Sequence, residues 1–237
     1  MTRRIYPNGG RSDCFVSVYC EMAMEAYYNA KKNCDFLAEN GYSCENMEEY
    51  GSMNKAIIAT VLFSAMAIEA FINDYAAACL GDSDFYDNFD RLSVFSKLEL
   101  IARFILKTSV DKSKSYYSHL KKLFKERDAY VHSKSKQLSF CGYTLEEIEE
   151  IDRLRRLNPQ KEYRFDEKEI KEDMQKAIVA LKAIRDIADY FDAYDSNVHA
   201  TIRMFQPGGE TYGSEKEQQY KTAAFHMLGM RFDNYEI

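Results

Sequence analysis

Apolar residues recur at helical spacing along most of the chain, and this spacing predicts several long helices. Residues 12–39 carry two neighbouring apolar stripes, and Asn40-Gly41 is typical of a helix end. Residues 52–80 are apolar on nearly all sides of the predicted helix, which is typical of a helix surrounded by others. We therefore expect the second helix to form the centre of a bundle.

The same periodicity continues through the second half of the chain. It predicts a third helix from about Leu92 to Lys107 and a fourth that begins near Ser113 and includes Tyr130. Residues 137–165 form an insertion with a short helix at 145–157. Asp166 and Glu169 have the spacing of a capping box, so a last long helix is predicted from 166 to about 194.

Few residues interrupt these helices. Three Pro and ten Gly in 237 residues favour long, continuous helical segments over a β-sandwich. The fold class predicted is all-α, an up-and-down bundle of four to five long helices over residues 12–195. Residues 1–11 are an N-terminal extension, and residues 196–237 are an irregular tail with one helical stretch at 214–228.

Cysteine usage and hydropathy suggest a cytoplasmic protein without a membrane span. The six Cys include no Cys-x-x-Cys pair, so reduced thiols are expected. The N-terminus lacks a secretory segment, and the most apolar run, residues 56–68, is shorter than a bilayer requires. His119, His199 and His226 have no acidic or Cys neighbours at ligand spacing, so neither a metal nor another cofactor is expected.

Charge is distributed unevenly along the chain. The net charge is −6, yet residues 91–136 contain twelve Lys or Arg against four Asp or Glu, a local net of +8. The rest of the chain therefore carries −14. Such a segment is either a solvated, lysine-rich helix face or an anion-binding surface, and the charge count leaves both interpretations open.

Arg127 and His132 lie in this basic segment and combine a permanent cation with a group that titrates near neutral pH. Five residues correspond to about 140° around an ideal helix. One straight helix therefore does not direct both side chains at one phosphate. Either the helix distorts or a second copy completes the site, and a two-fold dimer is the simple solution. Asp128 shares a face with His132 and is expected to accept a hydrogen bond from its imidazole.

Glu69 interrupts the apolar helix at 52–80, and Asn73 follows one turn later on the same face. A carboxylate on a central helix needs a cationic or donor partner. We expect Glu69 to hold Arg127 in place. The alternatives are that Glu69 lies on an exposed edge or forms an ion pair of purely structural value.

At these positions the chain resembles HEPN domains. Arg127-Asp-Ala-Tyr-Val-His132 is similar to the Arg-polar-x-x-x-His signature of that family, and Ala67-Ile-Glu69-Ala-Phe-Ile-Asn73 resembles the acidic helix that precedes it. The resemblance covers about residues 12–195. It implies a metal-independent endoribonuclease with Arg127 and His132 as the catalytic pair, supported by Asp128 and Glu69. Lys134 replaces the modified Tyr of some toxin members, so the chain departs from that subgroup.

The resemblance also implies partners and a role. Many members act as homodimers in toxin–antitoxin systems or in phage defence, so RNA, a second copy and an antitoxin or defence protein are the expected partners. RNA supplies its own 2′-OH nucleophile, so His132 would transfer the proton and Arg127 would stabilise the phosphorane. The expected phosphate-binding residues are Lys121, Lys122, Lys125, Lys134 and Lys136.

The rival interpretation is a non-catalytic helical module that binds RNA or protein. In that interpretation Arg127 and Glu69 form a structural ion pair, and the basic face binds its partner without cutting it. The sequence is compatible with both functions, because a Glu–Arg pair serves either one.

Overall fold

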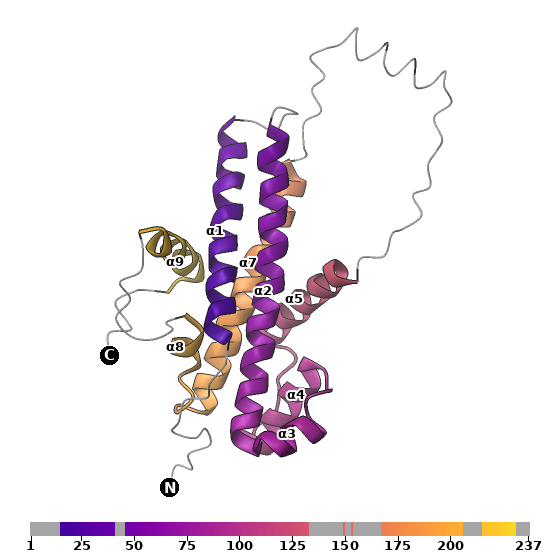
Figure 1. The fold of residues 1–237 in the computed structure, drawn as a ribbon, viewed down its shortest axis with the longest axis vertical. Coiled ribbons are helices and arrows are strands. Elements are labelled where there is room, and N and C mark those ends of the chain that lie inside the picture. The colour runs from indigo at the N-terminus through magenta and orange to yellow at the C-terminus, as the bar shows by residue number, and fades with distance from the viewer. Residues whose placement is uncertain are drawn as a thin grey trace.

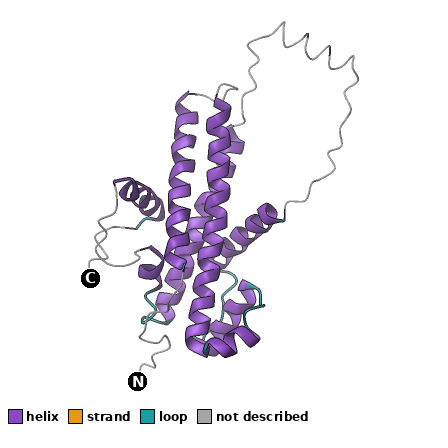
Figure 2. Ribbon diagram, viewed as in Figure 1, coloured by secondary structure: helices purple, strands orange, loops and turns teal. Residues whose placement is uncertain are grey.

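A computed structural model of the protein describes residues 15–40, 46–132, 167–205 and 215–230, together with the helical positions Glu149 and Arg153. Every regular element in these ranges is a helix (Figure 2), so the all-α prediction is confirmed. Apart from Glu149 and Arg153, the inserted helix predicted at 145–157 lies outside the described residues.

Two long helices form the body of the molecule. α1 (Val16–Asn40) and α2 (Met47–Leu80) lie side by side, and α7 (Glu167–Tyr194) packs behind them (Figure 1). α2 contacts α1, α3, α4, α5 and α7, so it is the central helix that its all-round apolar sequence predicts. In the middle of this core the ring of Phe191 meets Phe71 and Tyr75 edge-on, with centroids 4.9 and 4.8 Å apart.

The length and apolar composition of α2 also satisfy the criteria for a membrane span. An 18-residue window of this 34-residue helix has a mean hydropathy of 1.9, and 50% of the window is buried inside the fold. A buried core helix of a soluble protein can have the same length and hydropathy, so these properties fit a membrane span and a core helix equally.

A short helix precedes the third predicted helix, which is itself divided into an α-helical and a π-helical segment. α3 (Asp82–Asn88), which the sequence did not predict, follows Gly81, whose φ of 91° ends α2. α4 (Val94–Leu100) begins at Ser93, whose side chain accepts a hydrogen bond from the Ser96 amide. The segment η2 (Ile101–Ile105) continues it as a π-helix.

The π turn changes which residues face the core. The Leu106 amide donates to the Ile101 carbonyl at 2.9 Å, an i→i+5 bond. Leu106 is therefore buried, whereas Ile105 is only partly buried. Phe104 is left 57% exposed.

α5 (Ser115–Val131) leaves the bundle at an angle, and its C-terminal end points away from the other helices (Figure 1). Its base is held by aromatic contacts on two sides. Phe95 of α4 contacts Tyr117 and Phe124, while Tyr116 packs on Tyr190 of α7 with ring centroids 4.9 Å apart.

The described part of the C-terminal tail packs on the body rather than lying apart from it. α8 (Ala200–Phe205) was not predicted, whereas α9 (Glu215–Leu228) matches the predicted stretch at 214–228. Both contact α1 and α7, on the side of α1 away from α5 (Figure 1). Val198, Met204, Phe205 and Phe225 are at most 2% exposed, so these helices share the core of the bundle.

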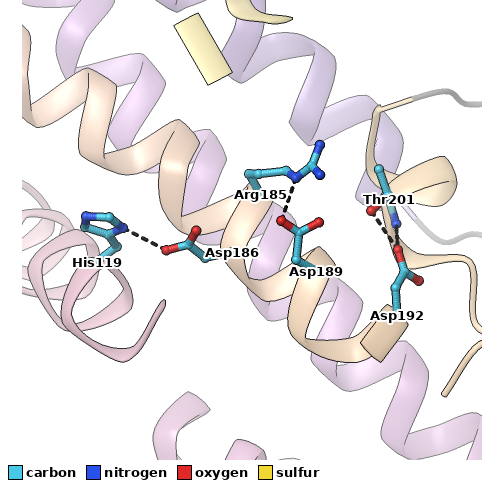
Figure 3. Close-up of polar contacts among 6 residues, drawn as sticks. All are labelled: His119, Arg185, Asp186, Asp189, Asp192 and Thr201. Atoms are coloured by element: carbon cyan, nitrogen blue, oxygen red, sulfur yellow. Dashed lines mark hydrogen bonds and ion pairs between the residues drawn. The ribbon is translucent and has the colours of Figure 1, made fainter. Parts of the chain in front are cut away.

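Asp192 of α7 fixes the start of α8. Its carboxylate accepts hydrogen bonds from the Ala200 amide at 2.5 Å, the Thr201 amide at 2.9 Å and the Thr201 hydroxyl at 2.6 Å. Figure 3 shows Thr201 directed at this carboxylate. The two buried amides at the start of α8 therefore have partners that the short helix cannot provide itself.

Candidate functional site

Arg127 lies in the last turns of α5, and one part of its side chain is fixed by the protein. Its Cζ lies 4.9 Å from the centroid of the Phe124 ring. Its Nε is 3.1 Å from Asp128 Oδ1, within the distance of an ion pair, yet Nε is buried and makes no hydrogen bond because the contact lacks the required geometry. The side chain as a whole is 30% exposed.

The outer part of the Arg127 guanidinium is available for an anion. No residue that the structure describes accepts a hydrogen bond from its two terminal nitrogens, and neither of them is an orphaned buried atom. A guanidinium whose Nε side is held by the protein, and whose terminal nitrogens have no acceptor, can bind a carboxylate or a phosphate.

His132 ends α5 and is exposed. Its amide donates to the Asp128 carbonyl at 2.9 Å, which closes the last helical turn. The expected bond between the Asp128 carboxylate and the imidazole is not formed, because that carboxylate lies against Arg127 instead. Asp128 therefore lies against the arginine rather than the histidine.

Arg127 and His132 occupy different faces of α5. Lys121, Lys125 and His132 are exposed and recur at helical spacing along the outer face. Arg127 lies about 140° away, toward the face that buries Leu120 and Leu123. Lys122 is exposed as well, whereas Lys134 and Lys136 lie outside the described residues.

Glu69 and Asn73 face a different cation from the one expected. Asn73 Oδ1 accepts a hydrogen bond of 2.8 Å from Lys97 Nζ, and Lys97 is only 2% exposed. Burial lowers the pKa of Lys97, while the carboxylates of Asp90 and Glu69 raise it. The expected Glu69–Arg127 pair is absent among the described residues, so this correction also removes the structural ion pair of the rival interpretation.

The reason for this correction is the position of α4. Lys97 lies among the apolar residues of α4 that pack on α2. Its ammonium group therefore occupies the place beside the polar residues of α2 where Arg127 of α5 was expected. Its charge was counted with the basic segment because it lies within residues 91–136, but burial removes it from the surface. A single lysine on a packed face carries no local sequence signal that separates it from exposed ones.

His119 and Asp186 form a polar pair that the sequence did not reveal. His119 Nδ1 lies 2.8 Å from Asp186 Oδ2, and each side chain is 24% exposed. Figure 3 shows the imidazole of α5 directed at the carboxylate of α7. The two residues are 67 positions apart, so no motif at ligand spacing could indicate the pair.

The described ranges contain no metal-binding cluster, and burial disfavours the thiolate form of two of their cysteines. No group of three or more His, Cys, Asp or Glu is placed there to hold a metal ion. Cys20, Cys34 and Cys79 form no disulfide, and Cys14, Cys44 and Cys141 lie outside the described residues. Burial raises the pKa of Cys79 to about 11 and also raises the pKa of Cys34, so few thiolates are present near neutral pH.

Comparison with known proteins gives no relative for this chain: no family model, no curated protein and no solved structure matches it.

Proposed function

We propose that this chain is a metal-independent endoribonuclease of the HEPN type, with Arg127 and His132 as its catalytic residues. The proposal rests on the arrangement of the Arg127 side chain. Phe124 and Asp128 hold one side of its guanidinium, while the terminal nitrogens have no partner among the described residues. An arginine with this arrangement is suited to an anionic phosphate, and the resemblance at Arg127 to His132 supplies the reaction class.

The chemistry follows from the two groups. The imidazole of His132 is exposed and takes the proton of the RNA 2′-OH or gives a proton to the leaving 5′ oxygen. Arg127 stabilises the added negative charge on the pentacoordinate phosphorus. Attack by the 2′ oxygen forms a bond to phosphorus and breaks the bond to the 5′ oxygen, which yields a 2′,3′-cyclic phosphate and a 5′-OH.

The proposal includes a homodimer. Because Arg127 and His132 face different directions on α5, one copy does not complete the site alone. The end of α5 projects from the body of the molecule (Figure 1), so two copies of this helix can meet without disturbing the bundle. Lys121, Lys122 and Lys125 then bind neighbouring RNA phosphates. A cytoplasmic toxin or a phage-defence factor is the role that this activity fits.

Cleavage of single-stranded RNA in the presence of chelator tests the function. We expect His132→Ala and Arg127→Ala each to lower the cleavage rate by roughly 10²- to 10⁴-fold. His226→Ala is the matched control, because His226 is also exposed but lies on α9. Cleavage by His132→Ala at the wild-type rate would refute the assignment, and activity that chelator abolishes would indicate a metal enzyme or a contaminant.

The second candidate is an RNA-binding module without catalysis. It is favoured by the exposed lysines on the outer face of α5, which suit the phosphate backbone whether or not cleavage follows. It predicts RNA binding that weakens with salt, and no cyclic-phosphate product from any variant. A strictly monomeric protein in sedimentation analysis would favour this candidate, because the composite site requires two copies.

A further inference from the structure

A continuous row of aromatic rings and cations joins α4 to the end of α5. Lys112 Nζ lies 5.8 Å from the ring of Tyr117, and that ring is 5.7 Å from Phe95. Phe95 is in turn 5.7 Å from Phe124, at an interplanar angle of 69°. Arg127 ends the row, 4.9 Å from the Phe124 ring. The row therefore links the rigid packing of α4 on α2 to the guanidinium on α5.

Phe124 is the fixed element in this row. Its side chain is 4% exposed, and the edge-to-face contact with Phe95 restricts rotation of its ring. Arg127 Nε makes no hydrogen bond, because its contact with Asp128 lacks hydrogen-bond geometry. The face of the ring is therefore the main constraint on the orientation of the guanidinium.

Two other arginines, Arg185 and Arg203, differ from Arg127 in how their guanidinium groups are held. Arg185 Nε donates a 2.7 Å hydrogen bond to Asp189, as Figure 3 shows, and Arg203 donates to Asp74. Both guanidinium groups are thus bound to a carboxylate by hydrogen bonds. Arg203 also lies over a ring, 5.7 Å from the Phe71 centroid. Arg127 combines its ring contact with no hydrogen bond to a carboxylate, which leaves its donors to an incoming anion.

We propose that Phe124 is a positioning residue for Arg127, and that Phe95 keeps its ring in the required orientation. The ring face directs the terminal nitrogens toward a phosphodiester anion. The catalytic consequence rests on the proposed ribonuclease function, but the positioning itself does not. The two claims are therefore tested by different measurements.

The positioning is tested without any activity assay, by NMR of the Arg127 Nε–Hε group. The ring face at 4.9 Å restricts the side chain, so we expect Phe124→Leu to lower the order parameter of this group, measured by nitrogen relaxation, toward the value of a free arginine. Phe225→Leu is the matched control, because Phe225 is 2% exposed and lies on α9. An Arg127 order parameter that is the same in Phe124→Leu as in the wild type would overturn the inference.

The consequence for catalysis is tested by kinetics and by chemical rescue. We expect Phe124→Leu to lower kcat about tenfold with little change in KM, because the arginine acts mainly in the transition state. Phe124→Tyr keeps the ring face and should retain near-wild-type kcat, which separates positioning from a general loss of stability. Guanidinium ion should restore part of the activity of Arg127→Gly, and about tenfold more should be needed when Phe124→Leu is also present.

The outcomes distinguish the two proposals. If Phe124→Leu cleaves RNA at the wild-type rate while Arg127→Ala is inactive, the inference is wrong and the ribonuclease proposal stands. If the wild type does not cleave RNA but Phe124→Leu lowers the Arg127 order parameter, the ribonuclease proposal is wrong and the positioning stands. Equal rescue by guanidinium in both backgrounds would also count against a role for the ring.

Discussion

Replacing Asp192 with alanine is expected to loosen the attachment of the C-terminal helices to the bundle. The Asp192 carboxylate accepts three hydrogen bonds of 2.5 to 2.9 Å from Ala200 and Thr201. Ala200 is 0% and Thr201 7% exposed, so water cannot readily replace the lost acceptor. The substitution therefore leaves two buried amides and a hydroxyl unsatisfied.

The magnitude follows from the kind of bond. A hydrogen bond to a charged group contributes roughly 1.5–3 kcal/mol, and bonds that share one acceptor do not add fully. We expect Asp192→Ala to lower the free energy of unfolding by roughly 2–4 kcal/mol. For a chain of this size that corresponds to a Tm lower by roughly 5–15 °C. Asp192→Asn keeps one carbonyl oxygen and should lie between the alanine variant and the wild type.

Thermal and urea unfolding followed by circular dichroism measure this loss, and hydrogen exchange at the Ala200 and Thr201 amides locates it. Asp189→Ala is the matched control, because Asp189 lies one turn earlier on α7 and its own side chain, which forms an i,i+4 pair with Arg185, is 50% exposed. We expect that control to cost less than roughly 0.5 kcal/mol. If Asp192→Ala and Asp189→Ala had equal stability, the argument from buried, charge-assisted bonds would be wrong.

Three further predictions concern the packing of α5 and α4 and the reactivity of one thiol. A double-mutant cycle with His119→Gln and Asp186→Asn should give a coupling of roughly 0.5–1.5 kcal/mol in urea unfolding, and a coupling near zero would refute the pair. Lys97→Met should raise stability at pH 7 by about 1 kcal/mol, because it removes a buried charge. Since burial lowers the folded pKa of Lys97 below its unfolded value, this gain should shrink as pH rises toward about 10.4, and a gain independent of pH would contradict it. Cys79, whose pKa burial raises to about 11, should be alkylated at pH 8 roughly a hundredfold more slowly than a free thiol, as peptide mass spectrometry can measure.

The long helices were predictable because their periodicity extends over many turns. α1, α7 and α9 lie within a few residues of the segments that the apolar stripes indicate, and the all-round apolar character of α2 correctly placed it at the centre. α3 and α8 were missed because each is 7 residues or fewer, which is too short to repeat a pattern. The π turn was missed because only the α repeat was considered.

The candidate site was predictable only in part. Arg127 and His132 were identified from the sequence, and their separation around α5 follows from helical geometry alone. The partners were not predictable, because each depends on how two helices pack. Lys97 meets Asn73 across 24 positions, and His119 meets Asp186 across 67. The role of Phe124 beneath Arg127 depends likewise on the packing of α4 against α5.

The π turn at Ile101–Ile105 has a consequence for how the length of this chain can vary. Its i→i+5 bond between Ile101 and Leu106 spans one residue more than an α-helix uses. A chain that lacked the exposed Phe104 would close the same span with an ordinary i→i+4 bond, and the leucine would keep its place in the core. This chain can therefore lose one residue at this position without moving α5, whereas a one-residue deletion within α4 would rotate that helix and change which of its residues face α2.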